Sequence, residues 1–463
     1  MNITAIRRKK IAIIGSGISG LSCAWLLNKA HNVTLFEKDD RLGGHSNTVD
    51  FSIEGQKVSV DTGFIVFNPV NYPNLVKLFE ELNVPNCDTE MSFAVSINEG
   101  HLEYSGTGLN GLLSQRLNIL RPSFWKMITD LLRFYRESDL MLENDPLDSL
   151  TLGELLKKHG YGNDFIYNHL LPMGAAIWST PVEKMLDYPA GSFLRFCKNH
   201  GLIQLQNRPQ WRTVIGGSKN YVNKIAKELE GKIQLNSRIH KIIRESDHVI
   251  IQDHHGNQQI FDEIVLACHS DQALALLDKP TNEEQQLLSD FPYQRNIAYL
   301  HLDEDLMPKR KAAWSSWNYL SEGQRDQSQQ VSLTYWMNKL QPLSTEQNIF
   351  VSLNPITPPK EGDIVRTFFY DHPTFGKNSH ASQQKLWQLQ GQHRTWFCGA
   401  YFGHGFHEDG LQAGLAVAEQ LGGIPRPWQL EEKNSRIFVK PIPTNNTHET
   451  PTASTINKGR IHG

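Results

Sequence analysis

The sequence predicts an α/β fold with a parallel sheet, an antiparallel meander and a second, mixed α+β unit formed by insertions. Near the N-terminus, Lys10–Ile14, Ile18–Ala30 and Asn32–Glu37 have the patterns of a buried strand, a helix and another buried strand. Residues 238–267 contain three short strands around a turn, then a continuous apolar strand typical of a parallel sheet. Residues 74–208 have mostly helical, amphipathic patterns, so we expect an inserted layer there.

The composition is that of a folded globular chain. The 463 residues include 46 basic and 49 acidic side chains, a formal charge of −3 that gives no reason to expect a nucleic-acid partner. Five cysteines without CxxC spacing indicate neither a disulfide framework nor a zinc cage, so we expect a reducing, cytoplasmic location. No apolar run approaches the ~18 residues of a membrane span. The basic run Arg7–Lys10 still allows peripheral contact with anionic lipid.

A glycine motif joins the first predicted strand to its helix. Gly15-Ser16-Gly17-Ile18-Ser19-Gly20 fits GxGxxG, and Glu37 ends the next strand. In this pattern Gly15 permits a tight turn, Gly17 admits a pyrophosphate against the backbone, and Gly20 allows close packing of helix on sheet. Glu37 would bind an adenosine ribose and disfavours a 2′-phosphate. The motif therefore predicts a dinucleotide site, although a glycine-rich turn without a ligand is the alternative.

A second glycine pair bears on whether the expected dinucleotide is NAD or FAD. Arg41-Leu42-Gly43-Gly44-His45 follows Glu37 closely, and here the chain resembles the superfamily of flavin-containing amine oxidases, protoporphyrinogen oxidases and phytoene desaturases. The resemblance implies FAD. Asp61-Thr62-Gly63, the paired-glycine turn Gly216-Gly217 and the stretch from Gly399 to Gly414 are similar to further family segments. A simple loop with two turn glycines is the alternative for residues 41–45.

The closing segment has a physical role of its own in this interpretation. A helix beginning near Asp409 would direct backbone N–H groups and the positive end of its dipole at the flavin. Together, the motifs and the resemblance assign FAD binding to these residues: Gly15, Gly17, Ile18, Ser19, Gly20, Glu37, Lys38, Arg41, Gly43, Gly44, His45, Asp61, Thr62, Gly63, Gly399, Phe406, His407, Asp409 and Gly410.

Departures from the family pattern limit what the resemblance implies about the reaction. Many amine oxidases carry a lysine in the strand where this chain has Arg295 and Asn296, so amine oxidation is in doubt. Phe406 occupies one position of the aromatic cage. No residue combines a family match with a physical argument for a general base, so no catalytic residue is assigned. His404, His407 and Glu408 lack metal-site spacing, and we expect no metal.

Apolar segments indicate the kind of substrate. Residues 171–181 form a nearly uncharged run around Trp178 that would line a hydrophobic tunnel or form ordinary core, and Trp178 and Phe406 are the predicted substrate contacts. A lipophilic substrate is also suggested by Phe64, Phe67, Trp314, Trp317 and Trp336. In detail the chain resembles predicted NAD/FAD-binding oxidoreductases associated with cyclopropane fatty acid synthases. That resemblance implies an unsaturated or modified fatty acyl substrate and association with a fatty acyl methyltransferase.

These inferences combine into one expectation. Residues 1–70, 212–278 and 392–430 would form a discontinuous, Rossmann-like FAD-binding domain with the meander; 71–211 and 279–391 would form the substrate domain; and 431–463 would be a disordered tail. The expected reaction is hydride transfer from a lipophilic substrate to flavin N5. One alternative is an amine oxidase acting on polyamines or aromatic amines. Another is a flavin-binding accessory protein of a lipid methyltransferase.

Overall fold

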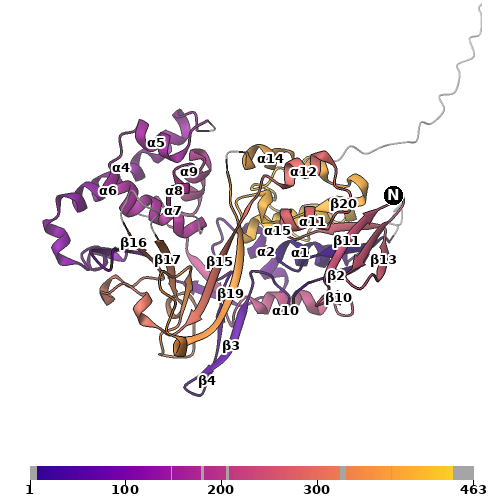
Figure 1. Ribbon diagram of the computed structural model, residues 1–463, viewed down its shortest axis with the longest axis horizontal. Helices are drawn as coiled ribbons and strands as arrows, with labels where there is room; N and C mark the ends of the chain where they lie inside the picture. The colour runs from indigo at the N-terminus through magenta and orange to yellow at the C-terminus, as the bar shows by residue number, and fades with distance from the viewer. Residues whose placement is uncertain are drawn as a thin grey trace, which may run out of the picture.

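The computed structural model describes residues 8–147, 149–178, 182–204, 208–323, 330–376 and 378–441. Figure 1 shows a molecule with two ends: a sheet with its helices on the right, a helical lobe on the left, and the long strands β15 and β19 between them. Buried apolar side chains form separate clusters, the largest around β1, α1 and α15 and the second around α4, α5, α7 and α9. The two ends therefore have their own hydrophobic cores.

The first end is built on a five-stranded sheet in which all neighbouring strands are parallel. Its order is β10 (Ile233–Gln234), β2 (Asn32–Phe36), β1 (Lys10–Ile14), β14 (Glu263–Leu266) and β20 (Thr395–Phe397). The meander β11 (Ile239–Arg244), β12 (Val249–Asp253) and β13 (Gln258–Phe261) is antiparallel, as predicted. Because parallel strands end at the same edge, their carboxyl ends gather there, where open α/β sheets bind ligands.

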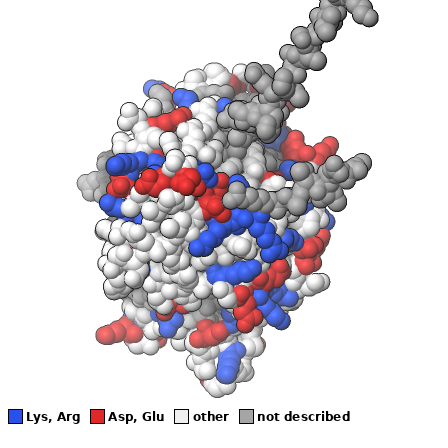
Figure 2. Space-filling view, turned by 90° about the vertical axis from the view of Figure 1, so that its right-hand side faces the viewer, with Lys and Arg blue, Asp and Glu red and all other residues white. Residues whose placement is uncertain are grey.

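Two helices at this end of the molecule pack closely on each other. They are α1 (Ile18–Leu27) and α15 (His407–Gly422). A Cβ built on Gly414 would lie 2.2 Å from the Ser19 carbonyl oxygen, so the two helices can touch backbone to backbone only with glycine at that position. At the same end of the molecule, Figure 2 shows Lys and Arg side chains lying among Asp and Glu side chains.

The middle of the molecule is a seven-stranded mixed sheet. Its order is β19 (Ile364–Pro373), β15 (Tyr293–His301), β18 (Phe350–Leu353), β17 (Gln330–Trp336), β16 (Trp317–Glu322), β7 (Phe93–Ile97) and β8 (Leu102–Ser105). Smaller sheets pair β3 (Thr48–Ile53) with β4 (Gln56–Asp61), and β9 (Trp211–Val214) with both β5 (Val66–Phe67) and β6 (Asn86–Thr89).

The helices form two groups, a lobe beside this sheet and a second group at the end of the molecule that carries the parallel sheet. The left-hand lobe in Figure 1 contains α4 (Pro122–Asn144), α5 (Leu152–Lys158), α6 (Asn163–Phe165), α7 (Leu171–Trp178), α8 (Val182–Met185) and α9 (Ala190–Asn199). It is preceded by α3 (Gly108–Leu112) and the 3-10 helix η1 (Arg116–Leu120). The remaining helices are α2 (Pro73–Glu81), α10 (Lys219–Glu228), α11 (Ser270–Leu276), α12 (Asn282–Leu288), α13 (Met337–Leu340) and α14 (Ser379–Leu386).

The structure differs from the sequence-based expectation in two places. Strands β6 to β8 interrupt the region predicted to be mostly helical, because residues 93–97 pair with β16, more than 200 positions away in the chain. Residues 431–441 are not a detached tail: Ile437 is buried, and Arg436 pairs with the buried carboxylate of Asp409. Arg7, residues 179–181 and residues 442–463 lie outside the described part of the chain. The exact limits of the two domains stay a prediction.

No helix within the described ranges is long and apolar enough to cross a membrane.

Candidate functional site

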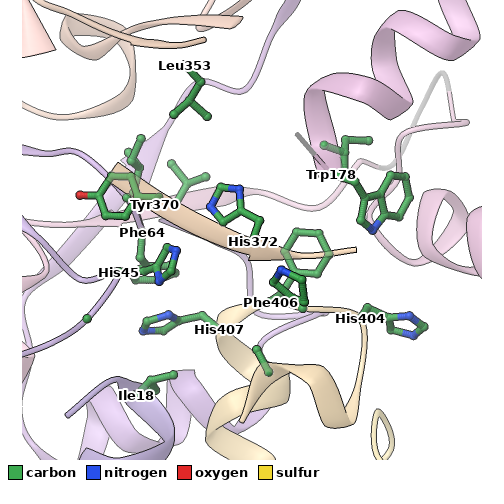
Figure 3. Close-up of a pocket in the computed structure, with 18 of the residues that line it drawn as sticks. Ile18, His45, Phe64, Trp178, Leu353, Tyr370, His372, His404, Phe406 and His407 are labelled. Carbon is green, nitrogen blue, oxygen red and sulfur yellow. The ribbon is translucent and has the colours of Figure 1, made fainter. Parts of the chain in front are cut away.

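One cavity of about 1870 Å³ connects the two ends of the molecule. Its wall runs from the carboxyl edge of the parallel sheet, past β19, to α4, α7 and α9 of the helical lobe. Figure 3 shows this progression from Ile18, His45 and His407 on one side, through His372 and Phe406, to Trp178 on the other. The predicted residues that line it are Gly15, Gly17, Ile18, Ser19, Glu37, Lys38, Arg41, Gly43, Gly44, His45, Thr62, Gly63, Trp178, Gly399, Phe406 and His407.

The first glycine turn is shaped for a ligand that touches the backbone. Gly15 has φ +103°, and a Cβ on Gly20 would lie 1.9 Å from the Gly15 carbonyl oxygen. By contrast, a Cβ on Gly17 would meet nothing within 4 Å. Helix α1 has no side-chain cap at Gly17, so its first N–H groups remain available to an anion. The turn therefore leaves room where a pyrophosphate is expected and closes the space behind it.

Glu37 stands at the end of β2 with its carboxylate already oriented. Its Oε2 accepts hydrogen bonds from the backbone N–H of Ser16 at 2.9 Å and from the Ser16 hydroxyl at 2.6 Å, and its Oε1 accepts one from Asp39 N–H at 3.1 Å. Each carboxylate oxygen has further lone pairs for a ribose hydroxyl. The glycine turn and the acid are thus held together as one unit.

The second glycine pair lies directly against the first turn. Gly43 N–H donates to the Ser16 carbonyl at 3.0 Å, and a Cβ on Gly44 would come within 3.1 Å of Gly17 Cα. Gly43 and Gly44 have φ values of +105° and +56°, which favour glycine. A Cβ on Gly63 would lie 2.2 Å from the His45 carbonyl oxygen. Segments separated in sequence therefore converge on one bare backbone surface.

Four predicted residues lie behind the wall instead of in it, and the structure corrects their assignment. Asp61 accepts hydrogen bonds from Ser218 N–H and from the side chains of Ser218, Thr48 and Gln341. Asp409 caps Phe406 N–H at 2.7 Å and pairs with Arg436. Gly410 packs on α1, and Gly20 fills the packing role proposed for it. The two carboxylates thus support the site from outside the cavity wall, Asp61 through hydrogen bonds and Asp409 through a hydrogen bond and an ion pair.

Burial keeps four histidines beside the cavity neutral. Burial, together with the neighbouring His372, lowers the pKa of His45 well below its usual value. Burial also lowers the pKa of His372 to about 4 and that of His407 to about 3, and it lowers the pKa of His269. His407 stacks on Phe64 with ring centroids 3.9 Å apart and forms a hydrogen bond with Tyr221 through Nε2.

Within the described ranges, no group of three or more His, Cys, Asp or Glu side chains is placed so that it could hold a metal ion.

Backbone contacts determine the tautomer of His372. Asn354 Oδ1 accepts from Ile297 N–H at 2.9 Å, so Asn354 Nδ2 is the donor to Asn296 Oδ1 at 2.7 Å. Asn296 Nδ2 is then left to donate to His372 Nδ1 at 3.1 Å. A neutral imidazole that accepts at Nδ1 carries its proton on Nε2. His372 therefore offers a hydrogen-bond donor to an acceptor atom on a ligand.

The far arm of the cavity is mainly apolar and aromatic. Trp178 packs against Tyr188, Phe193 and Phe196 with tilted rings, and the ring centroids of Phe406 and Phe196 are 4.8 Å apart. Other residues of this arm are Phe93, Leu112, Ile128, Leu131, Tyr135, Met173, Ile177, Leu202, Trp211, Trp317, Tyr335 and Leu353. We call this part the apolar arm.

The aromatic residues named from the sequence divide between the cavity and the core. Phe64 and Trp317 line the cavity. Phe67 is buried against Phe79, while Trp314 and Trp336 pack on each other beside Phe350. His269, Tyr370 and His372 were not predicted from the sequence, because an isolated residue before a helix or on a strand carries no motif. A weak signal existed in the alternation of β19, which places Tyr370 and His372 on the same face.

The site fits a flavin dinucleotide. Two glycine turns and an oriented acid line one end of the cavity, and His45 Nε2, which is buried at the same place, has no hydrogen-bond partner within the described protein. Such a backbone cradle beside an unpaired buried nitrogen is suited to a ligand with phosphates and a polar ring. Fold and site together define a dinucleotide-binding oxidoreductase with a large second compartment.

The chain belongs to the flavin-containing amine oxidoreductase family, whose family model matches residues 18–421. Membership of this family makes the chain a flavin-dependent oxidoreductase with FAD as its cofactor. Tryptophan 2-monooxygenase of Pseudomonas savastanoi is 23% identical over 320 residues, covering 61% of this chain and 56% of that protein. Flavin-containing amine oxidase A of Sus scrofa is 25% identical over 262 residues, 52% and 46% of the two chains. The chain thus spans about half the length of these curated relatives.

Solved structures share the fold over nearly the whole chain. Putrescine oxidase bound to putrescine has a TM-score of 0.64 at 14% identity, covering 89% of this chain and 99% of that one. A fatty acid isomerase from P. acnes that produces CLA has a TM-score of 0.62 at 16% identity, covering 88% and 97%. At these identities the likeness shows the fold alone, and these two proteins differ widely in what they act on.

Proposed function

We propose that this protein oxidises a lipophilic substrate, an unsaturated or modified fatty acyl chain, at FAD. The observation that carries the proposal is the continuity of the cavity, which joins the glycine turns to the apolar arm. An extended chain in this arm would bury apolar surface at roughly 0.8 kcal/mol per CH₂ group. The arm therefore supplies binding energy for a long hydrocarbon and little for a small, charged molecule.

The polar groups near the flavin end support the same substrate class. The buried histidines that line the cavity are neutral and carry no charge that would attract an ammonium group; outside the glycine turns, the acidic groups of the wall are Glu90 and Asp371. His372 presents a donor, which suits a carbonyl or carboxylate oxygen and has nothing to bond on a protonated amine. An acyl compound therefore satisfies both the apolar arm and the polar residue at its inner end.

The protein contributes position and exclusion of water. When bound, FAD supplies the two-electron acceptor for a hydride leaving a substrate carbon, and oxygen or another oxidant restores it. The aromatic and aliphatic wall keeps bulk water away from the reacting carbon, and His372 orients the oxygen end of the substrate. We further propose a cytoplasmic location and association with a fatty acyl methyltransferase, since such an enzyme uses the same lipophilic substrates.

Two other functions remain as alternatives. An amine oxidase is favoured by the aromatic rings at the junction of the two compartments, Phe64, Tyr370 and Phe406. A flavin-binding accessory protein would use the same cavity to hold lipid for a methyltransferase without turnover. The three functions differ in what reduces the flavin, so one experiment separates them.

The test is anaerobic mixing of the FAD-loaded protein with long-chain unsaturated acyl compounds, polyamines or aromatic amines. We expect loss of the visible flavin band with an acyl compound and its persistence with amines. Bleaching by amines alone would establish the amine oxidase function. Retention of lipid with an intact flavin band, over many hours and with every compound, would support the accessory role and overturn the proposal.

A further inference from the structure

Large apolar side chains are exposed within one short stretch of the chain, on α3, η1 and the start of α4, where the chain enters the helical lobe. Leu109 on α3 is 75% exposed, and Leu117 and Leu120 on η1 are 66% and 78% exposed. Ile119 and Trp125 are also exposed, within the same stretch of the chain. We call residues 108–126 the apolar rim. Single exposed leucines are ordinary, but a contiguous group marks an interaction surface.

The charges of the rim all have one sign. Arg116, Arg121 and Lys126 lie within it, and the chain has no Asp or Glu between Glu103 and Asp130. Arg116 and Lys126 are exposed, while Arg121 is held by the His101 carbonyl and the Asn118 side chain. Leucines, a tryptophan and basic residues without acids form the composition that lies in the headgroup region of an anionic bilayer.

The rim is also the entrance of the apolar arm. Leu109 and Leu112 line the cavity, as do Ile128, Leu131 and Leu132 on the adjoining part of α4. Trp125 is fixed at this edge, because its Nε1 donates to the Ile119 carbonyl at 2.9 Å. An apolar surface that continues into an apolar cavity can pass a hydrocarbon from one to the other without exposing it to water.

We propose that the apolar rim docks on the surface of an anionic phospholipid membrane and opens the cavity to the bilayer interior. Docking would insert the leucines of α3 and η1 into the headgroup layer, with Arg116 and Lys126 at the level of the phosphates. Docking of this kind involves only surface residues and the cavity entrance. It does not depend on the substrate proposed above, so a failure of either proposal can be recognised separately.

The test is sedimentation of the purified FAD-loaded protein with vesicles of phosphatidylcholine alone or of phosphatidylcholine with one quarter phosphatidylglycerol. We expect binding to the anionic vesicles, weakened by added salt. The double variant Leu117→Asp/Leu120→Asp should lower the vesicle partition coefficient at least ten-fold. Arg116→Glu/Lys126→Glu should remove the preference for phosphatidylglycerol. Both pairs lie outside the cavity wall, so flavin content should stay as in the wild type.

Ile260→Asp is the matched control. Ile260 is 55% exposed on β13, at the opposite end of the molecule from α4 in Figure 1. The same kind of substitution there should leave vesicle binding unchanged. Wild-type protein that stays in the supernatant with both vesicle types would overturn the proposal. A loss of vesicle binding in Ile260→Asp as large as that in Leu117→Asp/Leu120→Asp would also overturn it. A dimer in solution that Leu117→Asp/Leu120→Asp abolishes would assign the rim to a second copy of the chain instead.

Discussion

The two ends of the cavity are built on opposite principles. At the flavin end much of the wall is backbone: a Cβ on Gly44 would come within 3.1 Å of Gly17 Cα, and a Cβ on Gly63 would lie 2.2 Å from the His45 carbonyl oxygen. In the apolar arm the wall is side chain, with Trp178 and Ile177 projecting from α7 and other residues from four or more elements. A backbone cradle recognises a constant group such as a pyrophosphate, whereas a wall of side chains can change with the substrate while the fold remains.

The sharpest test of the backbone cradle compares two glycines of one motif. Gly20→Val would place a side chain on the Gly15 carbonyl oxygen, so we expect loss of folded protein, an effect of more than about 4 kcal/mol. A Cβ on Gly17 would meet no protein atom within 4 Å, so the fold of Gly17→Val should persist, while the side chain in the pyrophosphate space should lower FAD affinity roughly 100-fold or more. Circular dichroism and flavin content measure the two outcomes. A folded Gly20→Val protein, or a Gly17→Val protein with the FAD content of the wild type, would contradict this distinction between the two glycines.

Removing the charge of Glu37 tests the polar edge of the cradle. Glu37→Gln keeps the shape of the side chain but replaces one carboxylate oxygen, which accepts hydrogen bonds, with an amide NH₂ group, which donates them. This change affects the hydrogen bonds to Ser16 and to the expected ribose hydroxyl. Loss of hydrogen bonds to a charged group costs about 1.5–3 kcal/mol, so FAD affinity should fall roughly 10- to 100-fold. Isothermal titration of the apoprotein with FAD measures the change. Unchanged affinity would remove Glu37 from the ribose site.

The burial of His407, between the flavin end and the apolar arm, predicts that the stability of the protein depends on pH. The folded pKa of this histidine, about 3, lies below the unfolded value of 6.5, so below pH 6.5 the unfolded chain takes up a proton that folded His407 does not. Stability from this group is complete above pH 6.5 and is lost as the pH falls, by about 2 kcal/mol at pH 5. His407→Asn should reduce the fall in thermal midpoint between pH 7 and pH 5.

Tyr221→Phe is the comparison for that variant. It removes the hydroxyl that bonds His407 Nε2 but leaves the imidazole buried. Its thermal midpoint should be lower than that of the wild type at both pH values, with an undiminished fall between them. If His407→Asn and the wild type lose the same stability on acidification, the buried ring is not the source.

The smallest expected effect concerns the apolar arm alone. Ile177 lines the arm from α7 and is only partly buried, so Ile177→Trp should narrow the arm without disturbing the flavin end. We expect about a ten-fold weaker binding of long acyl chains, with unchanged affinity for FAD and for short-chain compounds. A uniform loss for all chain lengths would show that the substitution acts on the fold and not on the arm.

The difference between the flavin end and the rest of the cavity also explains what could be predicted from the sequence. The strands and glycine turns of the flavin end depend on local patterns, and Lys10–Ile14 and Val249–Asp253 form strands at their predicted positions. His372 could not be foreseen, because its orientation comes from Asn296 on β15 and from Asn354, which directly follows β18. Asp409 was placed beside the flavin, yet it pairs with Arg436 from a segment predicted to be disordered. Long-range contacts decide such cases, and local sequence patterns do not report them.

The most direct test of a shared cavity is a spectral titration of the FAD-loaded protein with a long-chain acyl ligand that cannot react. Because flavin and chain would occupy one cavity, binding should shift the visible flavin bands, and the dissociation constant read from that shift should rise in Ile177→Trp but not in Ile260→Asp. Tight acyl binding that leaves the flavin spectrum unchanged and is indifferent to Ile177→Trp would contradict the account.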